Sequence, residues 1–176
     1  TPVGNKTNGI SQMDVVSILN DSISQWNAYT PFDLKVVYSA APSNSKNKLF
    51  FSSNPSYFGS GVVAITEISY NVDTGTISSA DIIINDTQSL FSTLTFTKDE
   101  TDSSNQRAYL GDVFTHELGH FLGLSHSEVI GSSMIYSVFK NQHTVHTDDS
   151  SGVLDIYNTT MYEGELSGRV TGGAGN

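Results

Sequence analysis

Three histidines and one glutamate in the second half of the chain have the spacing of a catalytic metal site. His116, Glu117, His120, Gly123 and His126 match the pattern H-E-x-x-H-x-x-G-x-x-H at every specified position. Residues four apart share a face of an α-helix and lie about 6 Å apart along its axis, so two of these imidazoles can bind one ion. Imidazole is a common zinc ligand, and the segment therefore predicts a zinc site.

His126 can join the other two histidines only if the helix ends before it. In a continuous helix, His126 would lie about 9 Å beyond His120 along the axis and off the shared face. Gly123 stands where a left-handed residue would end the helix, a conformation that glycine adopts at little steric cost. We therefore predict that the chain reverses at Gly123.

A site with three histidine ligands leaves the fourth zinc position to water, which is typical of catalytic rather than structural zinc. Glu117 directly follows the first ligand, so it can take a proton from the zinc-bound water during attack on a carbonyl and pass it to the departing amine. The predicted reaction is peptide-bond hydrolysis. The alternative is that these histidines serve no common site. We disfavour it, because five specified positions match by chance on the order of once in 10⁵ chains.

The apolar spacing near the N-terminus predicts a helix over residues 11–29. Ser11, followed three residues later by Asp14, resembles a capping box at its start. Pro31 prevents an easy continuation. An apolar stripe with steps of three and four would form the buried face of this helix: Val16, Leu19, Ile23 and Trp26.

The metal motif is expected on a second helix, over residues 105–122. A third, shorter helix would begin at Asp148 or Asp149, because acidic side chains are favoured at the positive end of a helix. Segments rich in β-branched and aromatic residues predict strands between the first two helices: residues 34–38, 48–52, 62–70 and 81–85.

These elements predict an α/β (α+β) fold. Residues 82–84 are three consecutive isoleucines without alternation, which suits a strand covered on both faces. A chain of 176 residues fits one domain. We expect a catalytic domain over residues 1–160, and a Gly-rich linker or the start of a following module over residues 161–176.

The charge of the chain excludes some classes of partner. The formal net charge is -10 with eight Lys and Arg, whereas nucleic acids and anionic membranes require clustered basic groups. No apolar run is long enough to span a bilayer, and cysteine is absent. The chain begins at Thr1 without an initiator Met, so we expect that an upstream segment was removed. We also expect a secreted protein and a monomer.

Beyond the zinc motif, the chain resembles the metzincin metallopeptidases, and among them most closely the matrixins, the matrix-metalloproteinase family. Ser127 follows the third histidine, as is typical of matrixins, and Met134 lies where they place the methionine of the Met-turn, here residues 131–134. Residues 147–157 are similar to the matrixin C-terminal helix, and residues 26–32 to the end of its first helix. The resemblance covers about residues 11–158 and favours a bacterial-type member.

The resemblance implies a twisted mixed β-sheet, two long helices, and a small C-terminal subdomain with one helix. It also implies a zinc endopeptidase that binds a protein or peptide substrate in extended form along residues 61–70. The pocket beside the zinc would accept an apolar side chain. Asp112, one turn before His116, could make the deeper end of that pocket polar.

The chain departs from the matrixins at Tyr136, where they usually have proline. In astacins and serralysins a tyrosine at this position reaches the zinc or stabilises the tetrahedral intermediate. Tyr136 is therefore either an additional catalytic residue or part of the wall of the pocket. Vertebrate matrixins also bind a structural zinc through upstream histidines, but all five histidines of this chain lie at or after residue 116, so we expect that site to be absent. His143 and His146 are interpreted as surface or loop residues.

Calcium is a further candidate ligand. Asn71, Asp73 and Gly75 form a segment with oxygen ligands, and Asp81 and Asp86 follow nearby. An ordinary hairpin turn explains the same residues.

Two other functions stay open at this point. One is a non-catalytic zinc-binding or adhesion module on the same fold, which the intact Glu117 disfavours. The other is a metzincin closer to astacins or serralysins that uses Tyr136, which the absence of cysteines and of Gly-rich calcium repeats disfavours.

Overall fold

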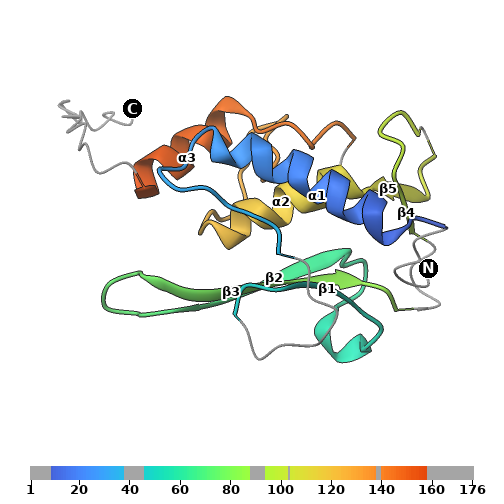
Figure 1. The fold of residues 1–176 in the computed structure, drawn as a ribbon, viewed down its shortest axis with the longest axis horizontal. Coiled ribbons are helices and arrows are strands. Elements are labelled where there is room, and N and C mark those ends of the chain that lie inside the picture. The colour runs from blue at the N-terminus through green and yellow to red at the C-terminus, as the bar shows by residue number, and fades with distance from the viewer. Residues whose placement is uncertain (1–8, 38–45, 88–93, 103, 138–139, 158–176) are drawn as a thin grey trace, which may run out of the picture.

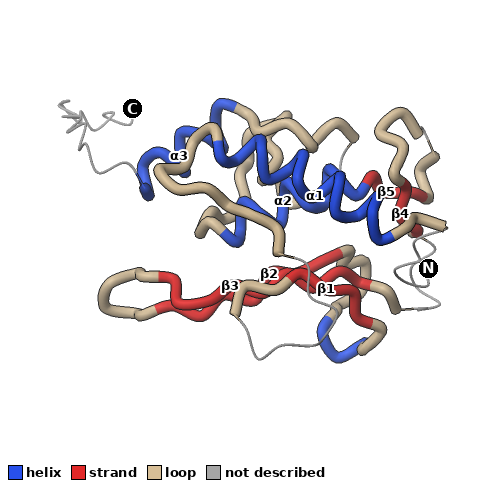
Figure 2. The backbone as a smooth tube through the Cα atoms, viewed as in Figure 1, coloured by secondary structure: helices blue, strands red, loops and turns tan. Residues whose placement is uncertain are grey.

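The helix that carries the metal motif lies between a second long helix and a small sheet (Figure 1). The computed structural model describes residues 9–37, 46–87, 94–102, 104–137 and 140–157. Its elements, drawn by type in Figure 2, are α1 (Gln12–Asn27), β1 (Leu49–Ser52), the short helix η1 (Pro55–Tyr57), β2 (Ala64–Tyr70), β3 (Ile77–Asn85), β4 (Thr95–Thr97), β5 (Arg107–Tyr109), α2 (Leu110–Phe121) and α3 (Thr147–Tyr157).

Helix α1 begins at the predicted capping box. The Ser11 hydroxyl accepts a hydrogen bond from the Asp14 N–H at 3.2 Å, and the Asp14 carboxylate accepts one from the Ser11 N–H at 2.8 Å. The buried stripe is rotated slightly from the predicted one, because Val15 and Ile18 are buried whereas Val16 is half-buried. The prediction of an amphipathic helix is confirmed.

Strand β3 forms the centre of a three-stranded mixed sheet, parallel to β1 and antiparallel to β2. Its isoleucines at 82–84 are at most 2 % exposed, as predicted for a strand covered on both faces. Among the described residues β2 pairs with β3 alone, so β2 is an edge strand.

The predicted strand over residues 34–38 is wrong for the described part, since residues 34–37 belong to no strand. The side chain of Asn27 holds the backbone of Leu34 instead. Its Oδ1 accepts from the Leu34 N–H at 2.8 Å, and its Nδ2 donates to the Leu34 carbonyl at 3.1 Å. Both main-chain groups of Leu34 are therefore occupied at the end of α1 and unavailable to a sheet.

Helix α2 begins at Leu110, later than predicted, because Arg107–Tyr109 form β5 and pair in parallel with β4. Both strands are three residues long, which is too short for a periodic signal. Helices α1 and α2 are joined by Trp26, which is fully buried and donates from Nε1 to the carbonyl of Thr115 at 3.0 Å.

Helix α3 begins at Thr147, one residue before the predicted start. It is fixed to the end of α2 by the Tyr157 hydroxyl, which donates to the Leu122 carbonyl at 2.9 Å. The predicted linker at 161–176 lies outside the described residues. None of the described helices is long and apolar enough to cross a membrane.

Candidate metal centre

The end of α2 forms the predicted reversal. Gly123 has φ +97°, its N–H donates to the His120 carbonyl at 2.8 Å, and the Leu124 N–H donates to the Gly119 carbonyl at 3.0 Å. These two bonds define a Schellman motif, in which a left-handed residue closes the helix. The chain therefore turns back within three residues of the second histidine and returns His126 to the same side of α2.

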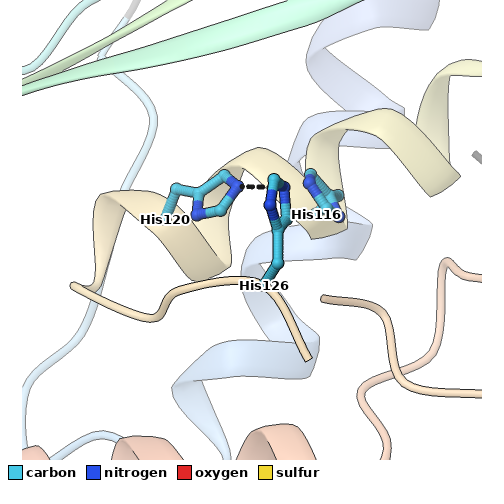
Figure 3. A group of neighbouring side chains, drawn as sticks. All are labelled: His116, His120 and His126. Atoms are coloured by element: carbon cyan, nitrogen blue, oxygen red, sulfur yellow. Dashed lines mark hydrogen bonds between the residues drawn. The ribbon is translucent and has the colours of Figure 1, made fainter. Parts of the chain in front are cut away.

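The reversal brings His116, His120 and His126 together, as Figure 3 shows. One ring nitrogen from each lies within 4.8 Å of the others, and the Nε2 atoms of His120 and His126 are 3.2 Å apart. Two ligands of a tetrahedral Zn²⁺, each bonded at about 2.0–2.1 Å, lie roughly 3.3 Å apart. The donor set and the spacing of the His120–His126 pair therefore fit one zinc ion.

The two helical histidines are oriented by main-chain carbonyls. Nδ1 of His116 lies 2.7 Å from the Ser133 carbonyl, and Nδ1 of His120 lies 2.7 Å from the Leu124 carbonyl. Because a carbonyl only accepts, each Nδ1 carries the hydrogen and each Nε2 presents its lone pair. Burial lowers the pKa of His116 to about 4 and also lowers that of His120. Both rings are thus neutral near pH 7, the state that binds a metal.

Met134 lies beneath the metal motif. It is 1 % exposed, and a Cβ built on Gly119 would collide with its sulfur. The same Cβ would lie 3.0 Å from Cζ2 of Trp26. Gly119 is therefore required between the two helical histidines, because α1 and residues 131–134 both approach α2 closely there.

The anchor of residues 131–134 is Asp149, which is 2 % exposed. Its carboxylate accepts hydrogen bonds from the hydroxyls of Ser132 and Ser133, from the Ser133 N–H at 2.8 Å and from the His146 N–H at 2.9 Å. The Ser133 carbonyl orients His116. Asp149 therefore influences the orientation of His116 through Ser133. The sequence marked Asp149 as a candidate helix cap, but its spacing gave no sign of this second role.

Glu117 is 5 % exposed and lies beside the histidines on the wall of a cavity of about 1300 Å³. Burial raises its pKa to about 7, whereas a hydrogen bond from Thr66 acts in the opposite direction. Thr66 belongs to β2, and its hydroxyl lies 2.6 Å from Oε2 of Glu117. The sequence did not mark Thr66 as a site residue, because a strand pattern gives no sign of which distant side chain a residue will contact.

Tyr136 also lines this cavity and is 79 % exposed. Its ring centre lies 6.3 Å from that of His126. The side chain is therefore next to the third histidine and accessible to a molecule bound in the cavity.

Asp112, which lines the cavity, contacts a histidine that the sequence did not predict as its partner. His143 lies in a loop, as predicted, but it is half-buried and its Nδ1 lies 2.9 Å from Oδ1 of Asp112. Glu100 lies 3.6 Å from its other ring nitrogen. Burial raises the pKa of Asp112, and the hydrogen bond from His143 opposes that shift. Asp112 therefore contributes a polar group to the wall of the cavity.

Asn71 forms the hairpin turn between β2 and β3. Its Oδ1 accepts from the Asp73 N–H at 2.8 Å and from the Thr74 N–H at 3.1 Å. Gly75, with φ +69°, donates to the Asn71 carbonyl at 2.8 Å. The hairpin alternative accounts for these residues, and calcium binding stays a prediction.

Comparison with known proteins identifies the family. The Matrixin family model matches residues 2–158. Part of the chain is 45 % identical over 64 residues to interstitial collagenase of Equus caballus, and 40 % identical over 68 residues to matrilysin of Rattus norvegicus. Each match covers 35 % of this chain, but only 14 % of the collagenase and 25 % of matrilysin. The chain belongs to the matrixin family, whose members are zinc-dependent endopeptidases.

Proposed function

We propose that this domain cleaves peptide bonds within proteins, with His116, His120 and His126 as zinc ligands and Glu117 as the general base. The observation that carries the proposal is the convergence of three imidazoles beside one buried carboxylate. These groups line one cavity together with strand β2. A closed structural zinc site would have neither the open fourth position nor a cavity facing it.

Bound Zn²⁺ would supply a Lewis acid that polarises the substrate carbonyl and promotes attack by water near neutral pH. Glu117 takes a proton from the attacking water and then donates it to the departing amine. A pKa of about 7 suits both transfers, because the carboxyl group neither holds nor releases the proton too strongly. Met134 packs against the helix that carries the proposed ligands, and Asp149 fixes Ser133, which orients His116.

The substrate would bind in extended form along β2. Among the described strands β2 pairs only with β3, and its residues line the cavity, so an added peptide strand could pair with the other edge of β2. Main-chain pairing provides affinity for many sequences, while the cavity beside His116 selects one side chain. The buried Asp112 favours a side chain with a hydrogen-bond donor at that position.

For Tyr136, the exposed position beside His126 supports a catalytic role, in which its hydroxyl donates to the oxygen that becomes negative during attack. Tyr136→Phe is then expected to lower kcat about tenfold and to leave zinc affinity unchanged. An unchanged kcat/KM on a peptide substrate would assign Tyr136 to the wall of the cavity instead.

The test of the proposed function is digestion of an unstructured protein. We expect cleavage that a zinc chelator abolishes and that added zinc restores, with Glu117→Ala inactive but still zinc-bound. Glu128→Ala is the matched control, because Glu128 is exposed and does not line the cavity. A zinc-bound but inactive wild-type domain would favour the non-catalytic module.

An extracellular location and a monomeric state also stay proposals. Recovery of the protein from the medium of the cells that produce it, and size-exclusion chromatography of the purified domain, would test them.

A further inference from the structure

Thr66 and Glu117 connect the edge strand to the metal helix through one side-chain contact. Oγ1 of Thr66 lies 2.6 Å from Oε2 of Glu117 and 3.2 Å from the main-chain oxygen of Glu117. The two residues are 51 positions apart in the chain. A hydroxyl has a single hydrogen, so the shorter contact marks the acceptor, and 2.6 Å is in the range of O–H···O⁻ bonds to a charged group.

Thr66 is a polar side chain on the half-buried face of β2. Alternation along the strand places Ala64, Thr66 and Ile68 on the same face, and all three are half-buried whereas Glu67 is exposed. Ala64 packs against the core. Thr66 therefore interrupts a partly apolar face at the point where that face meets Glu117.

We propose that Thr66 is a positioning residue for the general base, an inference that rests on the proposed role of Glu117. Among the described residues, Thr66 is the side chain that donates to this carboxylate. A carboxylate turns easily about its last torsion. With Oε2 held by Thr66, the other oxygen, Oε1, is directed to the attacking water.

The same contact keeps Glu117 in place during proton transfer. When Oε1 takes the proton, Oε2 becomes the carbonyl oxygen of a neutral acid and still accepts from Thr66. The orientation in which Glu117 receives the proton is therefore also the one from which it donates to the leaving amine. Because Thr66 belongs to the proposed peptide-binding strand, β2 would position the substrate and the base together.

The experiment compares Thr66→Val, which keeps the shape but removes the hydroxyl, with Thr66→Ser, which keeps the hydroxyl. We expect Val to lower kcat about tenfold with KM changed less than twofold, and Ser to stay within about threefold of wild type. Thr66→Ala is the second hydroxyl-free variant should Val disturb folding. Thr76→Val, in the exposed hairpin turn, is the matched control and should have no effect.

Two further measurements separate positioning from a general structural role. Zinc affinity, measured by competition with a chelator, should be unchanged in Thr66→Val because no ligand contacts this hydroxyl. A crystal structure of the metal-free Thr66→Val domain should show the Glu117 carboxylate turned from its wild-type orientation. Weakened zinc binding, an unmoved carboxylate, or a raised KM with unchanged kcat would each overturn the inference.

Glu117→Gln in the same assay distinguishes failure of the inference about Thr66 from failure of the proposed function. If Glu117→Gln is inactive while Thr66→Val has wild-type kcat, the inference about Thr66 fails and the proposed function stands. If Glu117→Gln keeps wild-type kcat, the base is not Glu117 and both fail. The double variant should be no less active than Glu117→Gln alone.

Discussion

At the scale of single residues, burial determines the chemistry of Glu117. A carboxyl group 5 % exposed beside apolar packing holds its proton more strongly than in water, and one hydroxyl from Thr66 does not fully compensate. The folded protein thus keeps a carboxyl group of near-neutral pKa at a cost in stability, and the pH dependence of unfolding measures that cost.

Glu117→Gln in the metal-free protein should change the pH dependence of unfolding. The pKa of Glu117 rises on folding from 4.5 to about 7, so above pH 4.5 the unfolded state ionises first and wild-type stability falls until about pH 7. Glutamine does not titrate. The variant should therefore gain roughly 3 kcal/mol over wild type across this interval. Urea unfolding at several pH values measures the difference, and a pH-independent difference would contradict the prediction.

At the scale of elements, one helix end and one turn build the ligand geometry. The reversal after α2 depends on Gly123, and the orientation of His116 depends on residues 131–134. Each feature has a substitution that should affect zinc binding without touching a ligand.

Gly123→Ala should weaken zinc binding by at least tenfold. Alanine at φ +97° costs about 1–2 kcal/mol, and its Cβ would lie 3.3 Å from Cδ1 of Ile77. Relief of that strain moves the segment that carries His126. Gly75→Ala is the control, because Gly75 has φ +69° with open space around it and is remote from the histidines in sequence. Chelator competition should distinguish them, and equal zinc affinities would refute the prediction.

Asp149→Ala should destabilise the domain by about 2–4 kcal/mol and also lower zinc affinity by about 10- to 100-fold. The substitution leaves buried donors of Ser132 and Ser133 without an acceptor and frees the carbonyl that orients His116. Asp148→Ala is the neighbouring control, since Asp148 is exposed and accepts only at the surface from Ser127. Thermal unfolding and chelator competition test both parts, and a loss of stability at unchanged zinc affinity would disprove the link to His116.

At the scale of the whole molecule, the candidate metal centre lies where separate parts of the chain meet. The end of α2, the segment after Gly123 and the turn at Met134 all converge on the histidines, while Trp26 holds α1 behind them. Metal binding should therefore stabilise the entire domain.

Zinc in excess should raise the free energy of unfolding by about 2.7 kcal/mol when free zinc is 100 times Kd. His126→Ala should abolish this gain, because two histidines of one helix bind far more weakly than three. His146→Ala should retain the zinc-dependent gain, since His146 is outside the cluster. Calorimetry with and without zinc measures the zinc-dependent gain in stability. A gain that persists in His126→Ala would place the ion elsewhere.

The features predicted from sequence were local ones. The capping box at Ser11, the left-handed Gly123 and the approach of three histidines follow from helix geometry within a few residues. The isoleucine segment of β3 was also predictable, because consecutive apolar residues suit a strand that is buried on both faces. The sequence did not predict β4 and β5. Each strand has only three residues and is defined by its pairing with the other.

Thus the sequence alone predicts the proposed ligands, the proposed base and the bend between them, all within eleven consecutive residues. Packing of the folded chain places other groups around that segment. Thr66 meets Glu117 across 51 positions, His143 meets Asp112 across 31, and Asp149 meets Ser133 across 16. Helix periodicity relates only neighbours a few residues apart, whereas such distant contacts depend on how the sheet, helices and turns pack.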